Sequence, residues 1–431
     1  MVRPRQAALN NIPDSESLDR GRADVRAILE GALRACEPGR LMARAFAAHP
    51  VPLDVPVVMC AAGKAARPMA QAFISLYAGR IRDVHVATGA HPVPDAASVE
   101  SGTRALDLAR ECHASGNRFV LLLSGGASSM LAIPADGVSL ADKRDLSRLL
   151  LRSGLAIGAM NAIRKHVSAI KGGQLAAAAA RSTTFALSDV HAPVEDDPSV
   201  IGSGPTVADP TTFADALDAL GEAGLIDCVP ASVLGRLRLG VRGDAAETVK
   251  PGDPRLFDAA FVLAGSRRDA MMGARDTAVA LGYDVECLGP PTLGEASVAG
   301  PRFIKDALVR ANGRRPCCII ASGETTVTLP HNGVGRGGRN QELALAAAAA
   351  LSADANAIFA SVGTDGMDGP TPAAGAFADS STMRRAAACG LDAPAALAGH
   401  DSYTFFETLG DLIVTGPTGT NVGDLQILLL T

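Results

Sequence analysis

The sequence predicts an α/β protein with two α/β domains and a cleft between them. Three observations lead to this prediction. Short apolar runs alternate with helix-like segments, clusters of Gly, Ser and Asp follow most of those runs, and 431 residues are enough for two or three domains. Ligands of such sheets bind beyond the carboxyl ends of the strands, where these clusters would lie.

In the N-terminal half, three apolar runs are expected to be parallel strands: Val57–Cys60, Phe119–Leu123 and Thr184–Leu187. The first leads through Lys64 into a helical stretch at 65–77. The second is followed by Ser-Gly-Gly-Ala-Ser-Ser at 124–129, and the third by Asp189. Small residues at such turns let backbone N–H groups and hydroxyls approach an anion, although the pattern also suits an ordinary strand-to-helix turn.

In the C-terminal half the pattern returns, with apolar runs at Phe261–Leu263, Cys317–Ala321 and Ile358–Val362 and helical stretches at 267–281 and 342–351. Residues 325–329 alternate like an edge or hairpin strand, and Leu425–Leu430 is an apolar strand that could join either sheet. Gly, Asp, Lys and Pro cluster between residues 241 and 255, as in linkers. We therefore expect an N-terminal domain over 1–250 and a C-terminal domain over 251–431.

The composition disfavours several classes of function. Forty Lys and Arg against 45 Asp and Glu give a net charge of −5, so no basic surface for nucleic acid or an anionic membrane is expected. Aromatic residues are 3% of the chain, which argues against base stacking. No signal peptide and no uncharged apolar run of about 18 residues is found, so a cytoplasmic protein is predicted. The eight cysteines form no CxxC motif, which disfavours a zinc site or a disulfide framework.

Charged residues near the expected strand ends are candidates for chemistry. Lys64 and Asp189 each follow an apolar strand, where a cation could reach a cleft and a carboxylate could bind metal or act as a general base. Arg336 and Arg339 flank paired glycines, and arginine suits bidentate binding of carboxylate or phosphate. Asp365 lies in Gly-Thr-Asp-Gly-Met-Asp-Gly, which is equally typical of a turn held by Asx hydrogen bonds. Spacing alone thus indicates a two-domain enzyme acting on a small anion.

Nucleotide-binding signatures are weak or missing. The P-loop pattern GxxxxGK[ST] is absent, and GxGxxG at Gly333, Gly335 and Gly338 does not directly follow a buried strand. A dinucleotide site is therefore disfavoured. His166 is expected to be a helix residue that faces a neighbour rather than a catalytic base.

Eleven co-linear motifs extend from about residue 55 to the C-terminus: 61–66 (AAGKAA), 89–95 (GAHPVPD), 123–129 (LSGGASS), 161–166 (NAIRKH), 170–173 (IKGG), 187–190 (LSDV), 197–206 (DPSVIGSGPT), 322–325 (SGET), 337–342 (GGRNQE), 363–370 (GTDGMDGP) and 410–421 (GDLIVTGPTGTN). Together they resemble the class II glycerate 2-kinases, whose C-terminal portion is called the MOFRL domain. Members of that family were formerly often labelled hydroxypyruvate reductases of tartrate utilisation.

The resemblance implies ATP-dependent phosphorylation of (R)-glycerate at its 2-hydroxyl, giving 2-phosphoglycerate and ADP, with Mg²⁺ or another divalent cation. It implies two three-layer α/β domains, the N-terminal one Rossmann-like, with the active site in the cleft between them. The family's active-site lysine, arginine and aspartate fall on Lys64, Arg339 and Asp365. Asp189 is a further catalytic candidate and, with Asp197, a candidate metal ligand. Substrate or nucleotide contacts are expected from Ser124, Gly125, Gly126, Ser128, Lys171, Glu324, Arg336 and Asn340.

The expected partners are therefore small molecules, not nucleic acid or membrane, and a homodimer is left open. One departure from the family pattern concerns the metal ligands. The family usually continues from Leu187–Val190 directly into Pro-Gly-Asp-Asp-Pro, whereas here His191–Glu195 precede Asp196 and Asp197. The roles of these two aspartates are open.

Two other functions are compatible with parts of the sequence. An NAD(P)H-dependent hydroxypyruvate reductase needs a dinucleotide fingerprint, which the GxGxxG match supports poorly. A phosphosugar-binding regulator would use the serine-rich loop, but no DNA-binding element accompanies it.

Overall fold

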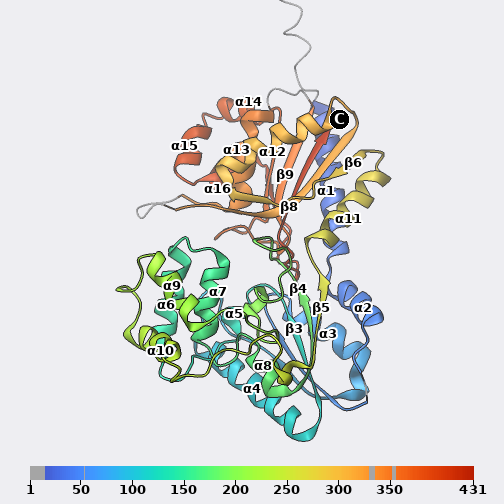
Figure 1. Cartoon of the computed structure of the whole chain (residues 1–431). Helices are drawn as coiled ribbons and strands as arrows, with labels where there is room; N and C mark the ends of the chain where they lie inside the picture. The colour runs from blue at the N-terminus through green and yellow to red at the C-terminus, as the bar shows by residue number, and fades with distance from the viewer. Residues whose placement is uncertain (1–14, 53, 330–334, 352–355) are drawn as a thin grey trace, which may run out of the picture. The chain divides into compact units, whose positions relative to one another are not determined.

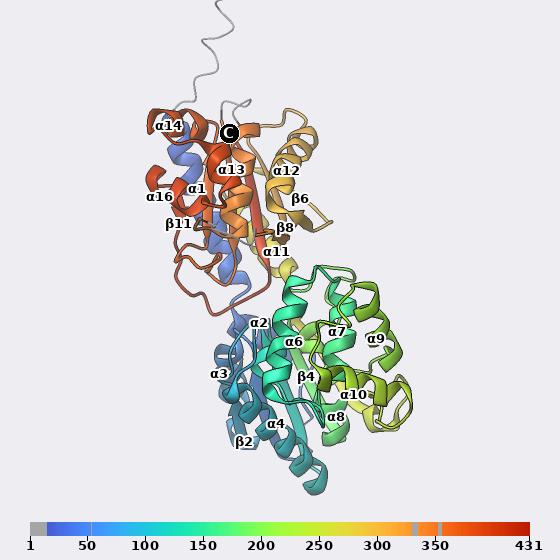
Figure 2. The ribbon, with the colours of Figure 1, turned by 90° about the vertical axis from the view of Figure 1, so that its left-hand side faces the viewer.

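The computed structural model describes residues 15–52, 54–329, 335–351 and 356–431, which form two compact units. The first unit consists of residues 38–265. The second unit joins residues 15–37 to residues 266–431. The predicted α/β class is confirmed, because each unit is a β-sheet with helices on both faces (Figures 1 and 2).

The sheet of the first unit is parallel and has the order β2-β1-β3-β4-β5. Its strands are β1 (Val57–Ala62), β2 (Ile81–Val86), β3 (Arg118–Leu123), β4 (Arg181–Leu187) and β5 (Asp258–Gly265). This is a doubly wound order in which the chain reverses direction across the sheet between β1 and β3. Such a switch point opens a crevice at the carboxyl ends of the two strands.

Helices cover both faces of this sheet. The helices α2 (Pro38–Ala48) and α3 (Ala66–Tyr77) pack on one face, and α4 (Ala96–Ser115) and α8 (Gln174–Ala179) on the other. Helix α4 begins at Asp95 with a capping box, in which the carboxylate accepts from the Ser98 N–H, and ends at Gly116 in the left-handed conformation. Short 3₁₀ turns lie at Ala78–Arg80, Ile201–Ser203 and Pro254–Leu256.

A helical cluster with its own apolar core belongs to the first unit. It consists of α6 (Leu140–Arg152), α7 (Ile157–His166), α9 (Phe213–Glu222) and α10 (Ala231–Val241). His166 lies inside this cluster: its Nδ1 is 2.7 Å from the carbonyl oxygen of Ala162 and its Nε2 is 3.0 Å from a Glu247 oxygen. The expectation that His166 is a helix residue facing a neighbour is confirmed.

The sheet of the second unit is mixed, with the order β11-β10-β9-β12-β8-β6. Its strands are β6 (Asp284–Cys287), β7 (Thr292–Glu295), β8 (Cys317–Thr326), β9 (Ala357–Gly363), β10 (Gly375–Asp379), β11 (Leu412–Ile413) and β12 (Asp424–Leu430). Strand β12 is antiparallel to both β8 and β9, so β8 and β9 run in the same direction and end beside the start of β12. Both β6 and β7 pair with β8.

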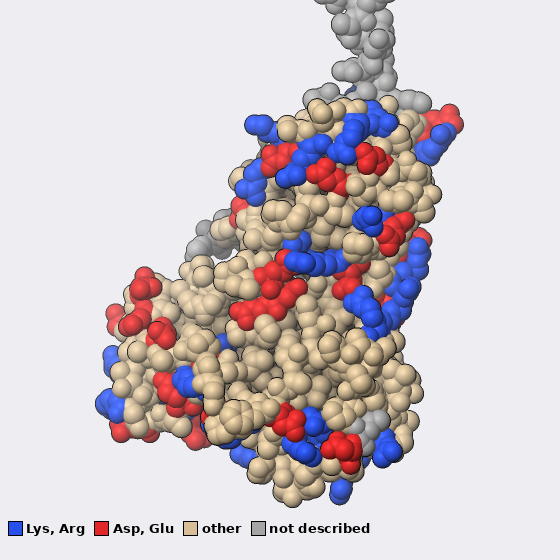
Figure 3. Space-filling model, turned by 45° about the vertical axis from the view of Figure 1, so that its right-hand side comes forward, with Lys and Arg blue, Asp and Glu red and all other residues tan. Residues whose placement is uncertain are grey.

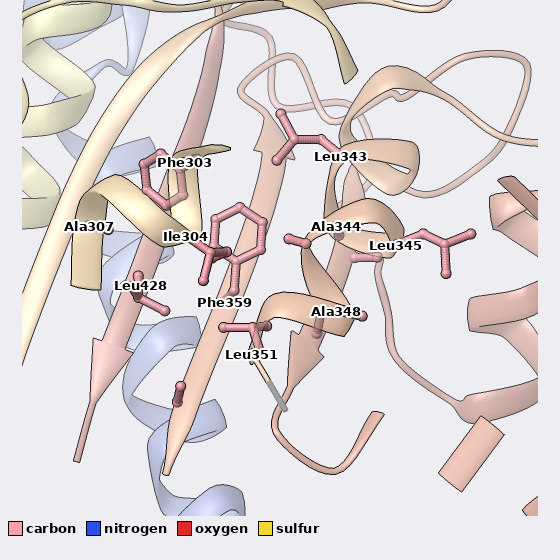
Figure 4. Close-up of a cluster of buried hydrophobic side chains, with 14 of the residues drawn as sticks. Phe303, Ile304, Ala307, Leu343, Ala344, Leu345, Ala348, Leu351, Phe359 and Leu428 are labelled. Atoms are coloured by element: carbon pink, nitrogen blue, oxygen red, sulfur yellow. The ribbon is translucent and has the colours of Figure 1, made fainter. Parts of the chain in front are cut away.

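Helices α1 (Ser15–Ala35) and α11 (Arg267–Ala280) cover one face of this sheet. The other face carries α12 (Ala296–Ala311), α13 (Arg339–Leu351), α14 (Thr382–Ala388), α15 (Ala393–Ala398) and α16 (Ser402–Leu409). Figure 4 shows the core beneath α12 and α13, where Phe303 and Ile304 meet Leu343, Phe359 and Leu428. The alanines of α13 let it pack closely between sheet and neighbouring helices.

Several predictions about organisation differ from the structure. The expected boundary at residue 250 falls inside the first unit, because β5 follows it and pairs with β4. The Pro- and Gly-rich stretch before β5 is thus a loop within a unit. The last strand does not return to the N-terminal domain, since β12 lies between β8 and β9. Residues 325 and 326 belong to β8 itself rather than to a separate strand.

Among the described residues, no helix is long and apolar enough to cross a membrane. On the face shown in Figure 3, acidic and basic side chains are interspersed rather than gathered into one basic field. This distribution agrees with the net charge of −5 and offers no extended footprint for a polyanion on that face.

The contact between α1 and α11 leads to a stability prediction. A Cβ on Gly273 would lie 2.3 Å from the Ala35 Cβ and 2.6 Å from the carbonyl oxygen of Gly31, so Gly273→Ala must push the helices apart. We expect it to lower the free energy of unfolding by about 2 kcal/mol in urea denaturation. Gly235→Ala in α10 is the control, because its Cβ would meet no described atom within 4 Å; it should stabilise by about 0.5–1 kcal/mol. Equal effects of the two variants would contradict close packing of α1 on α11.

Candidate active site

The first group of candidate residues lies where β1 and β3 end side by side, at the switch point. The Lys64 N–H donates to the carbonyl oxygen of Gly125 (2.9 Å), which ties the two loops together. A Cβ on Gly63, where φ is 116°, would lie 2.3 Å from Ser124 Oγ, so only glycine allows this approach. The exposed side chain of Lys64 is thereby held beside the loop at 124–129.

The serine-rich loop is an ordered turn with only one helical turn after it, α5 (Ala127–Met130). A helix this short has a small dipole, so the anion site cannot depend on it. Ser124 is fully buried, and its hydroxyl accepts a hydrogen bond from the Ala65 N–H (3.0 Å). Ser128 is half-buried, and its Oγ lies 2.8 Å from Ser203 Oγ. Of these two serines, Ser128 is the one with access to solvent, while Ser124 shapes the loop.

Lys171 supports the same loop from inside the protein. Its side chain is buried, and its ammonium donates to the carbonyl oxygens of Ser128 (2.8 Å), Gly202 (3.3 Å) and Leu131 (3.5 Å). Burial lowers the pKa of Lys171 well below its ordinary value, and the nearby cations lower it further. Since three carbonyl groups occupy the three donors of the ammonium, Lys171 is a positioning residue here; direct contact with substrate stays a prediction.

Asp189 and Asp197 both lie in the loop after β4 and are half-buried. The Asp196 N–H donates to the carbonyl oxygen of Val190 (3.1 Å), so the segment His191–Glu195 is a closed loop. The additional residues therefore leave the Asp-Asp-Pro segment next to the end of the Leu-Ser-Asp-Val motif. Asp197 Oδ1 accepts from the Ser199 N–H (2.8 Å), which orients that carboxylate.

The second group of candidate residues is built on Arg339, the first residue of α13. Its guanidinium donates twice to Asp424, from Nε (2.6 Å) and Nη2 (2.9 Å), and once to Glu324, from Nη1 (2.6 Å). Burial alone would lower the pKa of Arg339, but the two carboxylates raise it above its ordinary value. The predicted residues Glu324 and Arg339 are thus brought together near the end of β8 and the start of β12.

Asp424 is a site residue that the sequence reasoning missed. It is buried at the start of β12, opposite Gly323 of β8 and Gly363 of β9. The available signal was a single acidic residue immediately before the apolar run 425–430. Its importance depends on strand pairing across the sheet, which local patterns do not report.

Asn340 and Asp368 form a buried hydrogen-bond network at the start of α13. Asp368 accepts from the N–H groups of Asn340 (3.0 Å) and Gln341 (2.8 Å), and Ser361 Oγ donates to Asn340 Oδ1 (2.6 Å). Burial raises the pKa of Asp368 to about 6, against the hydrogen bonds that lower it. Asn340 is therefore turned into the protein, and its contact with a ligand stays a prediction.

Asp365 lies in the loop after β9, and Arg336 lies three residues before Arg339 in the chain. Asp365 is half-buried and its Oδ1 accepts from the Met367 N–H (3.1 Å), an Asx turn, so both of its proposed roles remain compatible with the structure. Arg336 is exposed, with its guanidinium carbon 4.3 Å from the centroid of the Tyr403 ring. Gly333 of the GxGxxG match lies outside the described residues.

The described ranges contain no group of three or more His, Cys, Asp or Glu side chains arranged to hold a metal ion. Mg²⁺ commonly uses only one or two protein carboxylates together with phosphate oxygens and water. The carboxylates of Asp189 and Asp197 provide oxygen donors of that kind in one loop.

Two family models match the chain. A domain of unknown function, DUF4147, matches residues 24–238, and the MOFRL family matches residues 317–424. Together they cover parts of both units.

Named relatives are similar over most of the chain. A glycerate 2-kinase of Pyrococcus horikoshii is 36% identical over 394 residues, covering 87% of each chain. A protein of Agrobacterium vitis with the provisional name hydroxypyruvate reductase is 39% identical over 359 residues, covering 82% of this chain and 89% of its own. The crystal structure of a glycerate kinase from Thermotoga maritima matches with a TM-score of 0.82 and 33% identity, covering 96% of this chain and all of that one.

The Arg339 contacts lead to a stability prediction. Asp424 is 1% exposed and Glu324 43% exposed, so the two partners of the same arginine differ in solvation. We expect Asp424→Asn to lower the free energy of unfolding by about 2–4 kcal/mol, since it leaves Arg339 without its buried counter-charge. Glu324→Gln, the matched control, should cost less than about 1 kcal/mol. Urea denaturation of both variants measures the difference, and similar losses would mean that burial does not distinguish the two contacts.

Proposed function

The chain belongs to the class II glycerate 2-kinase family, and from this premise we propose that it transfers the terminal phosphoryl group of ATP to the 2-hydroxyl of (R)-glycerate. The products are 2-phosphoglycerate and ADP. The reaction takes small-molecule substrates, and we place it in the cytoplasm. A homodimer stays open.

The observation that carries the proposal is the arrangement around Arg339. Three of the five N–H groups of its guanidinium donate to Asp424 and Glu324, so the group is held in one orientation and two N–H groups remain. Phosphoryl transfer needs rigid, positioned positive charge more than covalent participation by the protein. We assign these remaining N–H groups to oxygens of the transferring phosphoryl group.

Lys64 supplies the second positive charge. Its backbone is fixed by the Gly125 carbonyl and by the close approach of Gly63 to Ser124, while its side chain is exposed. An ammonium on a fixed backbone can stabilise the charge that develops on the phosphate as the bond to ADP breaks.

A carboxylate must receive the proton of the 2-hydroxyl. The oxygen of that hydroxyl forms a bond to the terminal phosphorus, the bond from this phosphorus to the bridging oxygen of ADP breaks, and the hydroxyl proton passes to the carboxylate. Asp189 and Asp365 are the candidates, since each follows a strand end and is half-buried. The choice between them stays open.

The loop after β4 fits a divalent cation such as Mg²⁺. Asp189 and Asp197 would hold it, because hard cations prefer carboxylate oxygens and two such ligands suffice when phosphate oxygens complete the shell. When bound, the ion neutralises charge on the phosphates during transfer. The Ser199 N–H keeps the Asp197 carboxylate oriented for this purpose.

The hydroxypyruvate reductase alternative has less support. A Cβ on Gly338 would lie 2.3 Å from Asp368 Cγ, so this glycine serves packing against a buried carboxylate. Close packing accounts for this glycine of the GxGxxG match without a dinucleotide.

A coupled assay tests the reaction. The purified chain with (R)-glycerate, ATP and Mg²⁺ should produce phosphoenolpyruvate when enolase is the only coupling enzyme, because enolase accepts 2-phosphoglycerate but not 3-phosphoglycerate. ADP release without that signal would mean that another hydroxyl or another acceptor is phosphorylated. Consumption of NADH with hydroxypyruvate, and no kinase activity, would favour the reductase.

Lys64→Ala should lower kcat by about 100- to 1,000-fold because a charge that stabilises the transition state is lost. The side chain is exposed, so the thermal unfolding temperature should change little. Arg80→Ala is the control, since it removes an exposed cation directly before β2, at the opposite end of the parallel sheet. Near-normal kcat in Lys64→Ala would remove Lys64 from the mechanism.

A further inference from the structure

The motif Asn161-Ala-Ile-Arg-Lys-His on α7 contains a buried amide of which only the oxygen has a hydrogen-bond partner among the described residues. Asn161 is 3% exposed, and its Oδ1 accepts from Ser203 Oγ (3.1 Å). Its Nδ2 donates to no group within the part of the chain that the structure describes. An unsatisfied buried donor costs free energy, so its retention points to a bound acceptor.

Arg164 lies three residues further along the same helix, which places it on the face of Asn161. The other two charged residues of the motif have acidic partners: Lys165 contacts Asp209 (3.2 Å) and His166 contacts Glu247 (3.0 Å). The half-buried Arg164 has neither a carboxylate partner nor a hydrogen bond among the described residues. Burial alone accounts for the lowered pKa of its guanidinium.

The neighbours of Arg164 are also cations. Its charge lowers the pKa of Lys143 and of Lys171, after the larger effect of burial on each. Both ammonium groups donate to backbone carbonyls, Lys143 to Val167 (3.1 Å) and Lys171 to Ser128 (2.8 Å), rather than to carboxylates. Three neighbouring cations that have no acidic partner within the described part of the chain attract an anion, and charge neutralisation would stabilise the fold.

This cluster meets the serine-rich loop. Ser203 Oγ bridges Asn161 Oδ1 and Ser128 Oγ, and Lys171 holds the carbonyl of Ser128. The Asn161 amide is therefore linked to the loop at the switch point by two hydrogen bonds through Ser203.

We propose that Asn161 and Arg164 bind the carboxylate of the acceptor substrate. The inference rests on the proposed function, because it assumes that the acceptor is a hydroxy acid. A guanidinium pairs with a carboxylate through two parallel hydrogen bonds, and the Asn161 amide can donate to one of its oxygens. Arg339, by contrast, already shares its charge with Asp424 and Glu324.

A fixed carboxylate also selects the hydroxyl that reacts. In glycerate the 2-hydroxyl is on the carbon bonded to the carboxylate, and the 3-hydroxyl is one carbon further away. Holding the carboxylate on Arg164 thus presents the 2-hydroxyl at a defined distance and leaves the 3-hydroxyl out of position. Arg164 and Asn161 become the residues that determine regiospecificity.

The test compares Arg164→Gln and Asn161→Ala with Arg152→Gln, which changes an exposed arginine of α6. Arg164→Gln should raise the KM for (R)-glycerate by about 10- to 100-fold and leave the KM for ATP within about twofold. Asn161→Ala should also raise the KM for (R)-glycerate, by a smaller factor. Arg152→Gln should leave the KM values for (R)-glycerate and ATP unchanged. The share of product accepted directly by enolase, relative to total ADP, should fall in Arg164→Gln, because the 3-hydroxyl then gains access.

Three outcomes would overturn the inference. A raised KM for ATP with an unchanged KM for glycerate would assign the cations to nucleotide phosphate. Unchanged KM values for glycerate and ATP in Arg164→Gln would mean that Arg164 binds neither substrate. If the KM for (R)-glycerate rises in Arg164→Gln but the 2-hydroxyl is still the one phosphorylated, Arg164 does not determine which hydroxyl reacts.

Two further measurements keep the inference separate from folding and from the proposed function. If Arg164→Gln fails to fold, Arg164→Lys, which keeps the charge but not the bidentate geometry, should still raise the KM for glycerate. Calorimetric titration of the wild-type chain and Arg164→Gln with (R)-glycerate alone measures the site without turnover. An inactive wild-type chain that binds glycerate through Arg164 would refute the kinase and retain the carboxylate site, whereas equal binding by both chains would refute the site.

Discussion

Parallel alignment of strands is the constraint on which both groups of candidate residues depend. In the first unit β1 and β3 are neighbours and end at one edge, which brings Lys64 beside the serine-rich loop. In the second unit β8 and β9 run in the same direction on either side of β12, so the start of β12 lies between their ends. Asp424 contacts Arg339 because β12 lies between β8 and β9. Each group thus collects residues that are far apart in the sequence.

Cationic side chains inside this protein have two kinds of hydrogen-bond partner. In the second unit, two arginines have buried carboxylate partners: Arg339 has Asp424 and Arg22 has Asp379 (2.8 Å). Around α7 in the first unit, Lys165 has the carboxylate partner Asp209, whereas Lys143 and Lys171 donate to backbone carbonyls instead. Carbonyl groups satisfy the donors of an ammonium but do not cancel its charge. Lys143 and Lys171 therefore have no carboxylate partner among the described residues, and an anionic ligand would supply one.

The sequence predicts local structure well and long-range contacts poorly. The apolar runs before Lys64, the serine-rich loop and Asp189 are strands in the structure, because hydrophobic periodicity reflects burial directly. The boundary near residue 250 was misplaced because Pro- and Gly-rich composition marks any loop, within a domain or between domains. Asp424 was missed because its partner Arg339 is brought to it by strand pairing. The motif resemblance named Lys171 and Asn340, but only the structure shows that each is turned inward.

The assignment of α1 to the second unit affects the order in which the protein folds. Residues 38–265 form a continuous unit that can fold while the rest of the chain is still on the ribosome. Helix α1 is synthesised before the first unit, yet its partner α11 is synthesised only after the whole first unit. The apolar face of α1 therefore stays exposed to solvent, or is bound by a chaperone, until the sheet of the second unit has been synthesised. Mutations that slow folding of the second unit should thus leave α1 exposed to aggregation and proteolysis.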